Sequence, residues 1–415
     1  MIVFNDTLGA YGGSHTLMLR MCRWLREHHI KAAVLCTSDA NEEIAGKIRA
    51  LDIPVICMDI KDLKKTAHIL RSLQEEEPIT VISFMWPYYL DMELIKRKAD
   101  LRFANIVYAI HPDTFKKGLR FENTFLHDLI AGSYGKILER MNRNKALYFM
   151  DEDVLKATRA FMKVSLDPHN PLLHLPMFCP ERKDAEEIIQ NGFASPVIMT
   201  AARAEYPYKG YLLGLVDTFK TLKVKYPALQ LEIVTGGMEE DVARLREKQS
   251  SLPEEFQKDI IFHNWMDYDT LRQEMERCKV FIGMGTSVLD AALVYKPAIA
   301  VKYNTFQVLA DGFLSSRPAC IAADPNCQTV AAVFLEQAFT MNEEEYRAAC
   351  LESFGQVKGY YDIDQTMRQL LEIKTEDDGC VMTSFEAARH YLNNRINRLL
   401  HRGEDRFNVQ SIKKE

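Results

Sequence analysis

Two glycines and two hydroxyl side chains interrupt an apolar stretch late in the chain. In FIGMGTSVLDAALVYKPAIAV (281–301) an apolar run breaks, and small residues with helical spacing follow. Glycines let the backbone approach a ligand, and the amides at the start of a helix favour an anion. The sequence therefore predicts a phosphate cradle, with Asp290 about one turn into the helix to accept hydrogen bonds from sugar hydroxyls. The cradle residues are Gly283, Gly285, Thr286 and Ser287.

A second turn supplies positive charge. TAARAEYPYKGY (200–211) carries Arg203 and Lys209 directly after a strand-like run. Two cations beside an anion cradle would neutralise a pyrophosphate and stabilise it as a leaving group while charge develops there. His111 follows another such run in YAIHPDTF (108–115), at a position suited to acid–base chemistry. These three side chains are the predicted catalytic residues.

A glycine-rich turn also lies near the start of the chain. NDTLGAYGGSH (5–15) contains Gly12 and Gly13, and Ser14 can cap the helix that follows. The turn lacks the GxGxxG order of a dinucleotide site. It still predicts a close approach between the backbone and a ligand.

The elements that position these turns alternate along the chain. Apolar runs rich in Val and Ile alternate with amphipathic helical stretches such as 14–29, a pattern typical of parallel sheets covered by helices. A proline-rich linker is expected at 165–183, and helices dominate from about 340, ending in a long amphipathic one. The expected strands are 1–5, 32–37, 54–58, 80–85, 105–110, 146–150, 196–202, 229–236, 259–264, 279–283 and 297–301.

This alternation predicts an α/β protein of more than one domain, since 415 residues exceed what one hydrophobic core usually organises. We expect a Rossmann-like N-terminal acceptor domain over 1–180 and a Rossmann-like donor domain over 181–345. The segment 346–415 is expected to form C-terminal helices that partly pack back on the N-terminal domain.

Taken together, these halves and turns resemble the GT-B glycosyltransferases, specifically the glycosyltransferase family 4-like group. The similarity covers about residues 1–310. It implies two Rossmann-like domains facing each other across a cleft, with a C-terminal helix. It also implies transfer of a sugar from a nucleotide-diphosphate sugar, with no cofactor and no essential metal. The second domain would hold the donor and the first the acceptor.

The resemblance also implies roles for individual residues. Arg203 and Lys209 would bind the donor diphosphate, Asp290 the nucleotide ribose, and His111 the transferred sugar. The chain departs from the family at Ile282, where a glutamate is usual. The remaining positions are Gly12 and Gly13, expected near the diphosphate and acceptor, and Asn264, Trp265 and Leu271 of HNWMDYDTL, expected beside the base.

Composition indicates which kinds of partner and which cellular compartment to expect. The net charge of -6 argues against nucleic acid, and nine scattered cysteines without a CxxC pair are typical of a reducing compartment. With no secretory signal pattern and no long apolar run, we expect a cytoplasmic protein. Residues 96–163 carry 14 Lys and Arg against eight Asp and Glu. This basic excess has two interpretations: a solvated helical face, or a peripheral contact with an anionic membrane.

The leading hypothesis is a hexosyltransferase-like enzyme that acts on a sugar or lipid-linked acceptor in cell-surface polysaccharide or glycolipid biosynthesis. The alternative is a non-catalytic GT-B homologue that binds a nucleotide sugar or a partner protein. A metal-dependent GT-A transferase would need the acid runs at 151–153 and 362–364. A nicotinamide dehydrogenase would need a phosphate fingerprint that the chain lacks. HExxH, Walker A and GxSxG patterns are absent.

Overall fold

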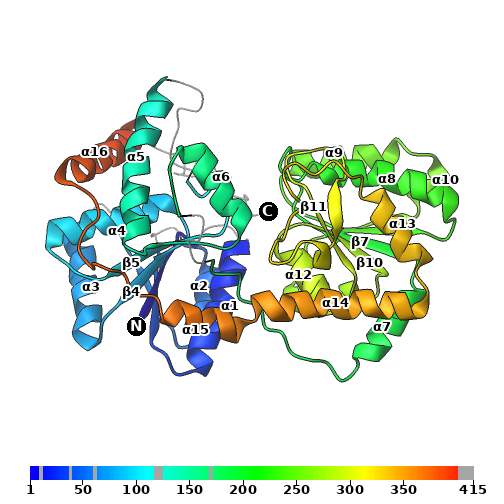
Figure 1. The fold of residues 1–415 in the computed structure, drawn as a ribbon, viewed down its shortest axis with the longest axis horizontal. Coiled ribbons are helices and arrows are strands. Elements are labelled where there is room, and N and C mark those ends of the chain that lie inside the picture. The colour runs from blue at the N-terminus through cyan, green and yellow to red at the C-terminus, as the bar shows by residue number, and fades with distance from the viewer. Residues whose placement is uncertain (9–12, 37–39, 59–62, 116–124, 168–171, 401–415) are drawn as a thin grey trace. The chain divides into compact units, whose positions relative to one another are not determined.

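The computed structural model divides into two compact units, Met1–Pro176 together with Ile363–Glu415, and Met177–Asp362 (Figure 1). It describes residues 1–8, 13–36, 40–58, 63–115, 125–167 and 172–400. The expected linker at 165–183 spans the boundary after Pro176. Helix α14 (Glu343–Tyr361) belongs to the second unit, and the two helices that follow it belong to the first.

The first unit is built on one parallel sheet with the strand order β3-β2-β1-β4-β5-β6. Its strands are almost wholly buried on both faces, apart from the edge strand β3, which explains their continuous apolar runs. The order reverses between β1 and β4. The strands are β1 (Ile2–Asn5), β2 (Ala32–Cys36), β3 (Val55–Cys57), β4 (Thr80–Ser83), β5 (Ala104–Ala109) and β6 (Leu147–Phe149).

Eight helices of the described residues belong to this unit. The helix expected over 14–29 is α1, and its apolar face, which includes Leu17, Met21 and Leu25, is buried. Helices α15 and α16, late in the sequence, contact α1 and α4 (Figure 1). The helices are α1 (Gly13–Glu27), α2 (Glu42–Arg49), α3 (Leu63–Glu76), α4 (Trp86–Ala99), α5 (Phe125–Arg143), α6 (Glu152–Met162), α15 (Ile363–Leu371) and α16 (Ser384–Leu400).

The second unit repeats the same plan with the strand order β12-β11-β10-β7-β8-β9. All eleven predicted strands of the chain are confirmed. The edge strand β12 pairs antiparallel with β11 and was not predicted, because its sequence ADGF has no apolar run. The strands are β7 (Val197–Ala201), β8 (Gln230–Val234), β9 (Ile260–His263), β10 (Val280–Gly283), β11 (Ala298–Val301) and β12 (Ala310–Phe313).

Helices cover both faces of this second sheet, and a core that includes Ile198, Phe219 and Leu231 is fully buried. None of the helices in the described part of the chain is long and apolar enough to cross a membrane. The helices are α7 (Ala185–Ala194), α8 (Tyr211–Lys225), α9 (Glu239–Ser250), α10 (Glu254–Gln257), α11 (Tyr268–Met275), α12 (Thr286–Leu293), α13 (Ala332–Thr340), α14 and the short 3-10 helix η1 (Leu314–Ser316).

Candidate functional site

The candidate site lies at the carboxyl edge of the second sheet. Strand β7 pairs in parallel with both β8 and β10, so the strand order reverses between β7 and β10. In open α/β sheets, ligands bind outside the carboxyl ends of the strands at such a reversal. The two turns singled out in the sequence, 202–210 and 284–287, leave these two neighbouring strands at that edge. The fold therefore brings the predicted cations and the predicted cradle to one place.

The turn after β7 carries two cations that influence each other. The side chain of Arg203 is half exposed, with its Nε 3.8 Å from Oε2 of Glu205. Lys209 is half-buried. Burial, and then the positive charge of Arg203, lower the pKa of Lys209 from 10.5 to about 8. Two cations on one turn favour a bound anion, because the anion relieves their repulsion.

A glycine pair after β8, which sequence reasoning missed, shapes the path of this turn. The amide of Ala204 donates to the carbonyl of Gly236 at 2.8 Å. Gly237 has a φ of 128°, and a Cβ there would lie 2.5 Å from the carbonyl oxygen of Ala204 and 3.0 Å from Cγ of Arg203. Glycine at 237 therefore lets the Arg203 segment run alongside the end of β8. The signal was present in the sequence as a glycine pair at a strand end.

The turn after β10 differs in detail from the predicted cradle. Gly285 has a φ of 78°, which favours glycine, but its amide donates to the carbonyl of Ile321 at 2.8 Å. The hydroxyl of Ser287 donates to the carbonyl of Met284 at 3.2 Å. Both donors are therefore engaged within the protein. What the turn offers an anion is the first turn of α12, whose amides have no acceptor within the helix.

Asp290 is buried in α12, with 4% of its surface exposed. Its Oδ1 accepts a hydrogen bond of 2.8 Å from the hydroxyl of Tyr268. Tyr268 is the first residue of α11, and it did not stand out in the sequence because the contact joins two helices. The carboxylate predicted to bind the ribose is therefore held by a neighbouring phenol.

The residues expected beside the base follow β9 at the same edge. Asn264 is exposed, Leu271 is half-buried, and Trp265 exposes 58% of its surface. A Cβ on Gly236 would lie 3.6 Å from Cβ of Trp265, so the indole-bearing segment lies against the glycine pair after β8. An exposed aromatic side chain of this kind can stack on a planar base.

Three of the predicted site residues belong to the first unit. His111 lies just after β5 with 34% of its side chain exposed, and its Nδ1 accepts from the amide of Asp113 at 3.0 Å. In the neutral ring the proton is then on Nε2, which makes Nε2 a hydrogen-bond donor. Gly13 is the first residue of α1 and is exposed. Gly12 lies outside the described residues.

The acid runs considered for a metal have structural roles. Asp151 caps α6 by accepting from the amide of Val154 at 2.8 Å. Asp364 accepts from Nε1 of Trp24 at 2.5 Å. Across the described ranges, no group of three or more His, Cys, Asp or Glu side chains is placed to hold a metal ion.

Much of the basic stretch 96–163 is engaged inside the first unit. Lys96 is buried, donating to the carbonyl of Phe103 at 2.9 Å. Arg97 donates to the carbonyl of Met382 at 2.9 Å, and Arg140 to Oε2 of Glu386 at 2.6 Å. These three cations therefore hold neighbouring segments together, among them the segment that leads into α16.

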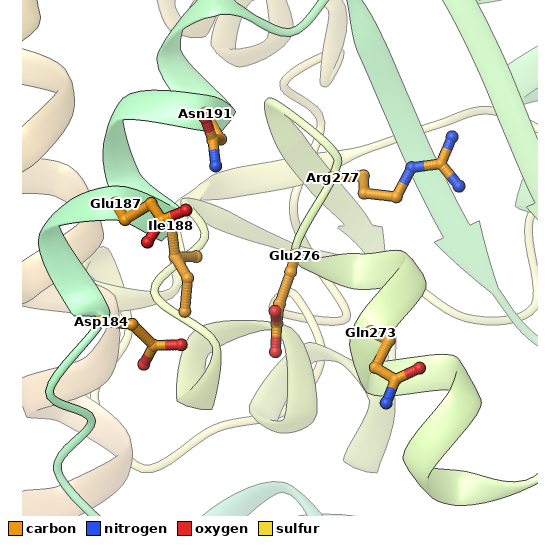
Figure 2. A pocket seen from close by; sticks show the side chains of 7 residues that line it. All are labelled: Asp184, Glu187, Ile188, Asn191, Gln273, Glu276 and Arg277. Atoms are coloured by element: carbon orange, nitrogen blue, oxygen red, sulfur yellow. The ribbon is translucent and has the colours of Figure 1, made fainter.

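A hollow of about 400 Å³ lies in a different part of the second unit (Figure 2). Glu276 and Arg277 on its wall come directly before β10, so this hollow is near the amino end of that strand. Arg182 pairs with both Asp184 and Glu276. The wall carries three carboxylates and one cation, and this balance does not favour a diphosphate. The lining residues are Asp184, Glu187, Ile188, Asn191, Gln273, Glu276 and Arg277.

Two Rossmann-like units with a C-terminal return to the first unit give the chain the GT-B fold of glycosyltransferases. No protein-family model and no curated protein sequence matches the chain. Solved structures do match in fold. A glycosyltransferase from Rickettsia africae has a TM-score of 0.65 at 13% identity, with 89% of this chain and 97% of that chain covered.

Two further solved structures match a similar share of the chain. HepE from Anabaena, in complex with UDP, has a TM-score of 0.63 at 13% identity, covering 89% of this chain and 98% of that one. Sucrose-phosphate synthase from Thermosynechococcus elongatus has a TM-score of 0.59 at 12% identity, covering 90% and 98%. At these identities the likeness establishes the fold, and the activity is a separate question.

Proposed function

We propose that the protein is a glycosyltransferase that moves a sugar from a nucleotide-diphosphate sugar to an acceptor. One observation carries this proposal. The turn that carries Arg203 and Lys209 and the first turn of α12 follow two neighbouring strands, β7 and β10, at the strand-order reversal of the second sheet. The Anabaena structures of the same fold contain UDP and UDP-glucose, which supports a nucleotide sugar as the ligand of this edge.

In the proposed reaction the bond between the anomeric carbon of the sugar and the diphosphate oxygen breaks. The diphosphate leaves with the bonding electrons, and Arg203 and Lys209 stabilise the charge that develops on it. An acceptor hydroxyl oxygen bonds to the anomeric carbon, and its proton passes to solvent water. His111 donates a hydrogen bond from Nε2 to the transferred sugar, in keeping with the acceptor role of its Nδ1.

The remaining site residues have proposed roles in binding the donor. Asp290 accepts from the ribose, and Trp265 stacks on or borders the base together with Asn264 and Leu271. Gly13, with Gly12, gives the diphosphate and acceptor close access to the backbone. Gly283 and Gly285 shape the turn that starts α12, and Thr286 and Ser287 supply its first amides.

The finer proposal places the reaction in cell-surface polysaccharide or glycolipid biosynthesis, at the inner face of a membrane and without a metal. The basic excess of 96–163 supports the membrane contact. Since Lys96, Arg97 and Arg140 are engaged internally, this contact depends on the other cations of the stretch. Sedimentation with vesicles of anionic and of neutral lipid tests it, and activity in excess chelator tests the metal.

A thermal-shift screen over nucleoside diphosphates and nucleotide sugars tests the donor site. At a ligand concentration 100 times Kd, binding stabilises the fold by about 2.7 kcal/mol, which is a readily measured rise in Tm. At least one diphosphate should raise Tm, and its nucleoside should not. Slow release of free nucleotide from the sugar donor then distinguishes a transferase from a binding protein. A chain that no nucleotide stabilises would contradict the proposal.

A further inference from the structure

Tyr268 has no role in the proposed reaction, yet it touches the carboxylate assigned to the ribose. Its hydroxyl donates to Oδ1 of Asp290 at 2.8 Å. Tyr268 exposes 36% of its surface and Asp290 4%, so a partly exposed phenol is hydrogen-bonded to a buried carboxylate. Tyr268 is the first residue of α11, and Asp290 lies within α12. These two helices pack against each other.

The direction of the phenol is fixed by its own helix. Asp267 caps α11, with Oδ1 accepting from the amides of Asp269 at 3.1 Å and Thr270 at 3.0 Å. One turn into the helix, the guanidinium carbon of Arg272 lies 5.7 Å from the centre of the Tyr268 ring. A capped helix start and a cation over the ring restrict the side chain before any ligand arrives.

A buried carboxylate with one oxygen already bound has a restricted orientation. An ionised Asp accepts through both oxygens, with about four lone-pair directions in total. When Tyr268 binds Oδ1, rotation of the carboxyl group about its last bond costs that hydrogen bond. The plane of the Asp290 carboxylate is therefore preorganised, and preorganisation lowers the cost of binding a partner.

We propose that Tyr268 is a positioning residue that gives the donor site its selectivity for ribose over deoxyribose, by orienting Asp290. This inference rests on the proposed function, in which Asp290 accepts from the ribose. It adds a residue that acts through another one, and it makes sugar discrimination the property that Tyr268 controls.

The experiment compares the natural chain with Tyr268→Phe, which keeps the ring over Arg272 and removes only the hydroxyl. Kd is measured by calorimetry for UDP, ADP, GDP and CDP and for the 2′-deoxy and 3′-deoxy forms of whichever bind. The natural chain should prefer the ribonucleotide. In Tyr268→Phe that preference should fall by about five- to tenfold, the effect of one hydrogen bond, with deoxynucleotide affinity unchanged.

Tyr360→Phe is the matched control, since it makes the same chemical change at a tyrosine of α14 that is 40% exposed. Its Kd values should equal those of the natural chain. An equal loss for ribo- and deoxynucleotides in Tyr268→Phe would mean a structural role and would overturn the inference, as would no change at all. If the natural chain binds both sugar forms equally, the ribose assignment fails while the diphosphate site stands. If it binds none of the four, the proposed function itself fails.

Discussion

The two edges of the second sheet carry different charged side chains. At the carboxyl edge, the turn that carries Arg203 and Lys209 and the start of α12 follow two neighbouring strands. The other place, near the amino end of β10, has an open hollow whose wall carries three carboxylates, Asp184, Glu187 and Glu276, and one cation, Arg277. Because a diphosphate carries negative charge, the two cations of the carboxyl edge favour it there. Strand direction and charge, rather than the volume of a hollow, are therefore the basis of the proposed site.

The largest expected effect comes from removing one cation at the carboxyl edge. Lys209→Ala and Arg203→Ala should each raise the Kd of the bound nucleoside diphosphate by about 10- to 100-fold, because hydrogen bonds to charged groups contribute about 1.5–3 kcal/mol. Calorimetric titration measures this. In a thermal-shift assay, Lys209→Ala should lose the rise in Tm that the diphosphate gives.

Arg277→Ala is the matched control, since it removes one cation from the wall of the hollow near β10. Arg277 is exposed and pairs with Glu274 at 2.8 Å, and salt screens distant exposed charges. Its Kd should stay within about twofold of the natural value. If Arg277→Ala weakened binding as much as Lys209→Ala, the comparison between the two edges would collapse.

The next effect is a pH dependence that belongs to Lys209 alone. Its pKa of about 8 is lowered by burial and by Arg203, and a bound diphosphate would raise it. Binding then takes up a proton above pH 8, so affinity should fall by up to tenfold per pH unit there and should level off below pH 7. The terminal phosphate group, with a pKa of about 6, is already ionised and adds nothing in this range.

Lys209→Arg tests whether this proton is the cause. Arginine stays charged, so the affinity of the variant for the diphosphate should not change between pH 7 and 10. The stability of the ligand-free protein should change with pH in the opposite direction. Between about 8 and 10.5 the unfolded chain binds more protons at Lys209 than the folded one, so this residue makes stability rise with pH. Equal pH profiles for the natural chain and Lys209→Arg would remove Lys209 as the cause.

The sequence predicted the sheets well because buried parallel strands appear as local apolar runs, and it missed β12 because that strand depends on pairing with β11. It also indicated the turns that reach the strand-order reversal. It did not indicate that the Gly285 amide bonds to Ile321, or that Tyr268 holds Asp290. These contacts join segments far apart in the chain, and no local pattern carries them.

The smallest expected effect on ligand binding concerns the glycine pair that supports Arg203. In Gly237→Ala, the new Cβ would lie 2.5 Å from the carbonyl oxygen of Ala204, at a φ of 128° that side chains rarely adopt. Such strain costs about 1–3 kcal/mol. In Gly236→Ala, the new Cβ would make an ordinary 3.6 Å contact with Trp265, so we expect a change within about 0.5 kcal/mol.

Both substitutions restrict the unfolded chain in the same way, so the difference between them isolates the strain in the folded state. Urea denaturation should place Gly237→Ala below Gly236→Ala in midpoint, with equal slopes. Because Cγ of Arg203 would lie 3.0 Å from the new Cβ at 237, that variant should also bind the diphosphate less tightly. Equal midpoints for the two variants would show that the Ala204 segment can move away without cost, and that the glycine pair does not set the position of Arg203.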